Sequence, residues 1–181
     1  GADKLNREIT ARFQKTYEAL EQEGLAEKKQ LVALHQQRVQ AELNDKKRHA
    51  MEHYMEVLTD PQADAMNIMK ALKHYIKNEQ RDRMHTVNHY KHLMDTDPSD
   101  ATVVHQQTLD HLHIIDQRIQ QAIDMLNRVP NYEQKVRMQI DDYMKQFHEI
   151  DIAINDILAA KVDAPKMKEL KTEPTTTTTT T

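Results

Sequence analysis

The residues best suited to chemistry lie between positions 66 and 94, where basic side chains and histidines are concentrated. This segment has six lysines and arginines against two acids, Glu79 and Asp82. At about 100° per residue on a helix, both acids fall outside one contiguous basic sector. The sector holds Lys70, Lys73, Lys77, Arg81, His74, His85, His89 and His92. A focused positive field attracts sulfate and phosphate, so this face predicts a polyanion surface. The alternative is an ordinary solvated helix face.

A second basic cluster, Lys46, Lys47 and Arg48, lies late in the preceding segment. The predicted polyanion-binding set is therefore the helical face Lys70, Lys73, Lys77, Arg81 and His85, with help from Lys46, Lys47 and Arg48. If the two segments pack antiparallel, the two clusters need not touch. The sequence alone leaves that question open.

The histidines also suggest a metal site. His85 and His89 are four residues apart, so both imidazoles lie on one helix face at chelating distance. An antiparallel hairpin turning near residues 60–62 pairs positions whose numbers sum to about 122. His35 sums to 120 with His85 and to 124 with His89. His35, His85 and His89 are thus candidate ligands. The alternative is that His35, in the stripe with Leu31 and Val39, is a hydrogen-bonded core residue beside an ordinary surface pair.

Motifs typical of enzymes are missing from the sequence. There is no Gly-rich phosphate loop, no nucleophile elbow, no His-Glu-x-x-His motif and no cysteine. The single serine, Ser99, lies in a helix-start context, and Asp141 and Asp142 lie among solvated charges. We therefore expect no catalysis and no required cofactor.

Long helices must position these residues. Aromatic residues make up 4% of the chain and glycine occurs twice, which is incompatible with an all-β or Rossmann-type fold. Pro61, Pro98 and Pro130 divide the chain into four predicted helical segments at roughly 3–59, 63–94, 99–128 and 131–160. The first would extend about 80 Å. We expect an elongated all-α protein, an antiparallel coiled-coil or helical bundle with one very long helix and three further main helices.

The apolar residues divide this rod into parts. A coiled-coil part is expected at about 3–95 and a bundle part at about 96–160. The early half of the first helix is polar, with a narrow stripe at Leu5, Ile9, Phe13, Tyr17 and Leu20 that predicts a partner helix. Residues 161–181 end in seven threonines and predict a disordered linker or stalk. No apolar run approaches the roughly 20 residues of a membrane span, so we expect a soluble piece of a larger protein.

Three stretches, at 31–58, 71–93 and 110–130, resemble the central helical ectodomain of the amyloid precursor protein family. The most specific parts are Leu43-Asn44-Asp45 followed by three basic residues, and Glu79-Gln80-Arg81-Asp82-Arg83 followed at one residue's distance by His85. The resemblance runs from about Ala2 to the late 140s and indicates an invertebrate member of the family.

The resemblance implies the extracellular domain of a single-pass membrane protein. Domains of this family bind heparan sulfate, dimerise antiparallel and carry a four-histidine copper or zinc site. By position, His35, His85 and His89 match three of those ligands. The fourth ligand lies on an earlier helix, and this chain is expected to begin after that helix.

Three functional classes follow. The leading one is an extracellular adhesion module for heparan sulfate or heparin, which dimerises and carries a copper or zinc site. The second is a structural coiled-coil oligomerisation rod, and the third is a metal-handling domain. Nucleic acid is not expected as a partner, because only Tyr75 and Tyr90 are interleaved with the basic residues.

Overall fold

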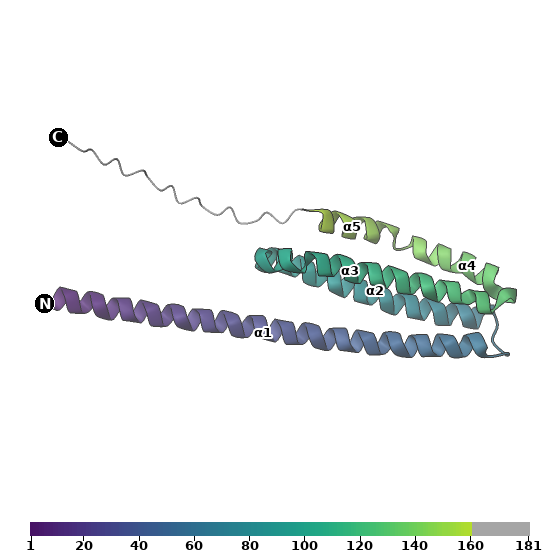
Figure 1. Cartoon of the computed structure of the whole chain (residues 1–181), viewed down its shortest axis with the longest axis horizontal. Coiled ribbons are helices and arrows are strands. Elements are labelled where there is room, and N and C mark those ends of the chain that lie inside the picture. The colour runs from purple at the N-terminus through teal and green to yellow at the C-terminus, as the bar shows by residue number, and fades with distance from the viewer. Residues whose placement is uncertain (161–181) are drawn as a thin grey trace, which may run out of the picture.

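The computed structural model describes residues 1–160 of the 181-residue chain, and the predicted linker or stalk at 161–181 lies outside the described residues. Its elements are all helical within that range: α1 (Ala2–Thr59), α2 (Ala65–Thr96), α3 (Pro98–Asp124), the short 3-10 helix η1 (Met125–Arg128), α4 (Pro130–Lys145) and α5 (His148–Ala159). Figure 1 shows α2 and α3 alongside the second half of α1, with α4 and α5 running back over them. The predicted all-α, elongated fold is confirmed.

Local sequence signals set the helix boundaries. The Asp64 carboxylate accepts a 2.9 Å hydrogen bond from the Asn67 backbone N–H and caps the start of α2. Asp97 caps α3 in the same way, at 3.1 Å from the Asp100 N–H, and Pro98 follows in the first turn. Pro130 opens α4. The first three predicted segments therefore lie where the sequence placed them.

The fourth predicted segment is two helices, which corrects the expectation of a single helix at 131–160. The chain tightens after α4, where the Gln146 and Phe147 N–H groups bond to the carbonyl groups three residues earlier. The Phe147 ring then packs edge-on against Tyr143, with 5.2 Å between centroids. The break lets Ile154 and Leu158 of α5 reach the core. The sequence shows no break because the apolar spacing continues across it without proline or glycine.

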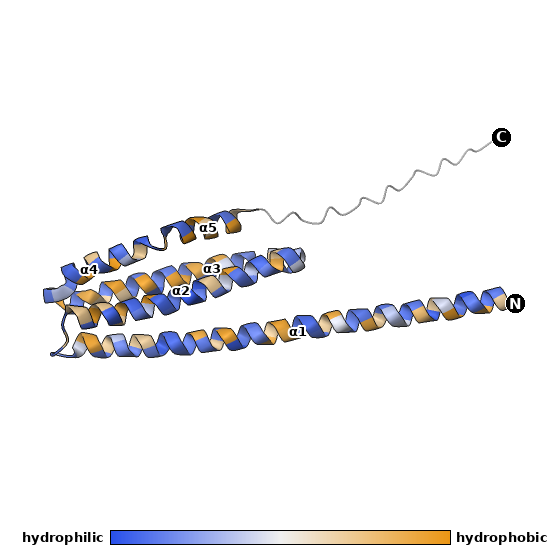
Figure 2. Cartoon of the chain, turned by 180° about the vertical axis from the view of Figure 1, so that it is seen from behind, coloured by the Kyte–Doolittle hydropathy of each residue, from blue (hydrophilic) through white to orange (hydrophobic). Residues whose placement is uncertain are grey.

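Helix α1 has two halves that differ in burial. At about 1.5 Å per residue, its 58 residues extend some 87 Å. In the outer half (residues 2–28), the apolar stripe is exposed to between 56% and 71%: Leu5, Ile9, Phe13, Tyr17 and Leu20. Figure 2 shows these hydrophobic bands with no other helix beside them. The inner half (residues 29–59) is buried along one face, formed by Leu43, Lys47, Ala50, Tyr54 and Leu58. The inner half therefore belongs to the bundle.

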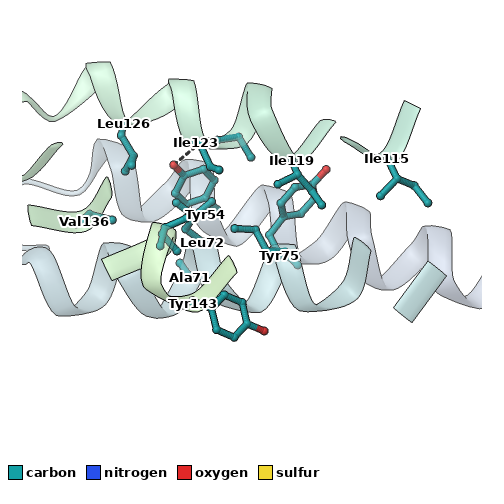
Figure 3. Packing of buried hydrophobic residues seen from close by; sticks show 14 of the residues in the cluster. Tyr54, Ala71, Leu72, Tyr75, Ile115, Ile119, Ile123, Leu126, Val136 and Tyr143 are labelled. Atoms are coloured by element: carbon teal, nitrogen blue, oxygen red, sulfur yellow. Dashed lines mark hydrogen bonds between the residues drawn. The ribbon is translucent and has the colours of Figure 1, made fainter. Parts of the chain in front are cut away.

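One hydrophobic core joins the helices. Figure 3 shows Tyr54 of α1, Leu72 of α2 and Ile119 of α3 converging, with Leu126 and Val136 closing one end. All five are buried. Within residues 1–160, every helix falls short of the combined length and hydropathy needed for a bilayer crossing.

Candidate functional site

A groove of about 370 Å³ lies between α1 and α2. We call it the histidine groove; its lining residues are Lys46, His49, Ala50 and His53 of α1 and His74, Asn78 and Arg81 of α2. Cations from both basic clusters of the sequence line this one groove. The antiparallel pairing of α1 and α2 thus brings Lys46 to the same opening as Arg81, which the sequence could not settle.

Local hydrogen bonds hold the groove's side chains. The Asn78 amide donates a 3.1 Å bond to the backbone carbonyl of His74, and its oxygen lies 3.5 Å from the Arg81 guanidinium. His49 Nδ1 donates a 2.8 Å bond to the Asp45 carbonyl. Lys46 forms an exposed 3.0 Å ion pair with Glu42, one turn away. Exposed pairs of this kind contribute little stability, so Lys46 can exchange Glu42 for a stronger anion.

The three lysines of the predicted polyanion-binding set lie on the solvent side of α2, whereas Arg83 is buried and pairs with Asp116 of α3. Lys70, Lys73 and Lys77 are exposed. The Lys73 ammonium lies 4.7 Å from the centroid of the Tyr143 ring, a cation–π contact to α4. Arg48 is exposed on α1 and pairs with Asp45 at 2.6 Å. These four side chains are therefore exposed cations on the two helices that form the histidine groove, although they do not line it.

The prediction that Lys47 belongs to the polyanion-binding set is wrong, because only 7% of this residue is exposed. Its ammonium lies 2.6 Å from the Asp82 carboxylate and 3.7 Å from Glu79. Lys47 points into the bundle, since successive residues on a helix diverge by about 100°. It therefore does not belong to the polyanion surface, although Lys46 and Arg48 on either side of it do reach solvent.

Glu79 and Asp82 form the centre of a buried charge network across three helices. Arg118 of α3 donates to Glu79 at 3.1 Å, and His111 Nε2 donates to Asp82 at 2.9 Å. The amide of Gln40 and the hydroxyl of Thr86 also donate to Asp82, at 3.3 Å and 3.2 Å. Burial alone would raise the pKa of Asp82, but the hydrogen bonds from His111 and Lys47 outweigh it and hold that pKa well below its usual range.

Sequence reasoning did not identify this network, although the sequence contains an indication of it. Glu79 and Asp82 fall on the apolar side of α2 in the helical projection, where an unpaired carboxylate would be costly. Acids in an apolar stripe predict buried cations on a neighbouring helix.

The predicted metal ligands are only partly brought together. His85 and His89 are half-buried and line a second groove, of about 370 Å³, with residues of α1 and α3 that include Gln40 and His111. Burial lowers the pKa of both His85 and His89, so their imidazoles are mostly uncharged at neutral pH and chemically suited to copper or zinc. Across residues 1–160, however, no three His, Cys, Asp or Glu side chains are arranged to hold a metal ion.

His35 departs from its expected surroundings. It is exposed, and Leu31, one turn earlier, is 67% exposed. The face of α1 toward the bundle instead runs through Gln36, Gln40 and Leu43. Because His35 is one residue away from this face, it turns toward solvent. It remains close enough to His85 that its charge contributes to lowering the His85 pKa.

Comparison with known proteins gives a consistent result. The family model described as the E2 domain of amyloid precursor protein matches residues 1–126. An amyloid-beta precursor-like protein of Doryteuthis pealeii is 42% identical over 172 residues, which cover 95% of this chain and 28% of that protein. The chain thus spans less than a third of that relative's length.

Two solved structures share the fold. The apo E2 domain of amyloid precursor protein-like protein 1 has a TM-score of 0.72 and 31% identity, covering 78% of this chain and 76% of that one. The E2 domain of APL-1 from C. elegans, in complex with sucrose octasulfate, has a TM-score of 0.73 and 37% identity, covering 82% and 70%. The chain therefore belongs to the amyloid precursor protein family, and it contains the helical E2 region of that family.

Proposed function

We propose that this chain is an extracellular binding and adhesion module for heparan sulfate or heparin, without catalytic activity. The observation that supports this most directly is the histidine groove, where Lys46 of α1 and Arg81 of α2 line one opening. The exposed Lys70, Lys73 and Lys77 extend the same positive surface along α2. We also propose that the parent protein is anchored in a membrane, which membership of the family supports.

The physical basis is displacement of counterions. A sulfated polysaccharide carries a condensed layer of cations, and each lysine or arginine that replaces one releases it into solution. Binding should therefore weaken steeply with salt. The sulfated sugar in the C. elegans APL-1 E2 complex has the ligand chemistry that we propose for this chain.

Heparin affinity chromatography tests the proposal. We expect the parent chain to elute well above physiological salt and the Lys77→Ala/Arg81→Ala variant to elute earlier, with the salt slope reduced by about one per cation. A matched control is Lys4→Ala/Lys15→Ala, which removes two exposed charges from the outer half of α1. Equal retention of the parent and the Lys77→Ala/Arg81→Ala variant would exclude this surface. Elution of the parent near physiological salt would favour a structural rod.

We also propose that the chain forms an antiparallel homodimer. The exposed stripe on the outer half of α1, with Phe13 at its centre, supports this because contiguous apolar surface usually marks an interface. Sedimentation velocity should show a dimer that Phe13→Ser weakens. A monomer at all concentrations would contradict it.

A copper or zinc site at His85 and His89 is the second candidate function. These two imidazoles are one turn apart, and burial lowers the pKa of each. His35 would have to approach from α1, and solvent or a second chain would complete the coordination.

A further inference from the structure

Two pairs of neighbouring residues meet across the α1–α2 interface. On α1, Lys46 lines the histidine groove while Lys47, the next residue, is buried. On α2, Arg81 lines the groove while Asp82, the next residue, is buried. The two buried members form a 2.6 Å ion pair. Lys46 and Arg81, the two groove cations, are therefore each next in sequence to one member of the buried Lys47–Asp82 ion pair.

We propose that Lys47 and Asp82 act as a positioning pair, which fixes how Lys46 and Arg81 stand relative to each other across the groove. The inference rests on the proposed polyanion function and assigns it a determinant of selectivity. A groove with a fixed separation of cations selects ligands whose sulfate groups have a matching separation.

The surroundings of the pair explain why it can hold the register. Gln40 and Thr86 donate to the other oxygen of the Asp82 carboxylate, from α1 and α2, and His111 does so from α3. Sliding α1 by one turn would move it about 5.4 Å and separate Lys47 from its partner. Lys47 would then be buried without its carboxylate partners and Asp82 would lose its closest cation, which is strongly disfavoured. The contact therefore resists both sliding and rolling of α1.

A ligand with rigid sulfate spacing distinguishes this role from simple attraction. Long heparin can rearrange along the surface and find the same number of cations. Sucrose octasulfate is compact, so it depends on the geometry of the groove. We therefore expect loss of the positioning pair to affect the two ligands unequally.

The test variant is Lys47→Met/Asp82→Asn, which removes one charge of each sign and leaves the Glu79–Arg118 pair intact. Replacing a whole buried pair with a neutral one of similar volume is usually tolerated. The matched control is Lys145→Met/Asp142→Asn, an exposed 3.3 Å pair on α4. Affinity for each ligand is measured by calorimetry, and melting temperature is recorded for every variant.

We expect affinity for sucrose octasulfate to fall roughly fivefold to tenfold in the test variant, with long-heparin affinity and salt slope close to the parent values. Lys47→Arg should retain affinity because it keeps the charge. Thr86→Val removes one hydrogen bond to Asp82 without changing charge, so it gives a milder test, with a smaller loss in the same direction, if the double variant folds poorly. The control should match the parent.

A second measurement reports the distance between α1 and α2 directly. The chain has no cysteine, so spin labels can be placed through Glu42→Cys and Met84→Cys on exposed positions of α1 and α2. The distance distribution between the labels should broaden in the double variant and stay narrow in the control.

The possible failures can be told apart. If Lys46→Ala and Arg81→Ala weaken binding but the double variant binds sucrose octasulfate as the parent does, the positioning role is wrong and the proposed function stands. If the parent binds neither sulfated ligand, the proposed function is wrong, and the positioning role fails with it.

Discussion

The hydroxyl of Tyr54 on α1 donates a 2.8 Å hydrogen bond to the backbone carbonyl of Ala122 on α3, and neither residue reaches solvent. Figure 3 shows this bond beside the buried side chains of the core. Ala122 lies in the last turn of α3, where carbonyl groups lack partners within the helix. A side chain from α1 thus satisfies a helix end 68 residues away.

Replacing Tyr54 with phenylalanine should destabilise the fold by about 1–2 kcal/mol, because a buried carbonyl loses its partner while the ring still packs. Urea denaturation measures the change. Tyr132→Phe is the matched control, since Tyr132 is only partly buried and its hydroxyl makes no hydrogen bond within residues 1–160, so this change should have little effect. An equal loss in both variants would show that the buried bond contributes nothing.

Asp82→Asn should destabilise the protein by about 3 kcal/mol at neutral pH, because Lys47 then keeps its buried charge without its closest partner. The pKa of Asp82 is held below its usual range in the folded state, so its contribution is present above the unfolded value of about 3.9 and is lost as pH falls toward the folded value. The gap between parent and variant should therefore narrow progressively below about pH 4. Denaturation curves at several pH values check this, with Asp141→Asn as an exposed control. A gap that does not depend on pH would contradict the assignment.

Heparin affinity should increase several-fold between pH 7.5 and pH 6. Imidazoles gain positive charge over this range, and His49, His53 and His74 line the groove with two permanent cations. Replacing all three histidines with glutamine should flatten the pH profile. Calorimetry at the two pH values makes the comparison. A triple variant with the parent's pH dependence would place the responsible protons elsewhere.

Micromolar zinc or copper should raise the melting temperature if His85 and His89 bind the ion, because ligand binding to the folded state stabilises it by mass action. The increase should disappear in acid, since imidazolium cannot ligate a metal. His85→Ala should abolish it and His35→Ala should reduce it, whereas His113→Ala, an exposed histidine of α3, should not. Equal stabilisation of all four proteins would show that the ion binds elsewhere.

The sequence predicted the helices well because their boundary residues act locally. Asp64, Asp97 and the prolines depend on neighbours within a few positions, so their effect can be recognised without a structure. The register arithmetic also held approximately, since Gln40 bonds to Asp82 and the two numbers sum to the expected 122.

The rotation of α1 about its own axis could not be predicted in the same way. Its buried face includes the polar Gln36, Gln40 and Lys47, so an apolar stripe does not mark that face. The stripe of Leu31 and Val39 predicts that His35 faces the bundle, but His35 is exposed. For the same reason, three consecutive cations gave no indication that Lys47 is buried, because its partners lie 32 and 35 positions further along the chain.

The continuity of α1 has a mechanical consequence. The outer half and the inner half are one uninterrupted helix, so neither can rotate without applying torque to the other. The outer half projects from the bundle. Where α2 meets α3, the exposed Lys29 side chain of α1 forms ion pairs with Asp97 and Asp100. A bending load applied near Phe13 would be transmitted along the helix, past Lys29, to the turn that presents Lys46. Tension on the outer arm and the alignment of the groove are coupled through the stiffness of a single helix.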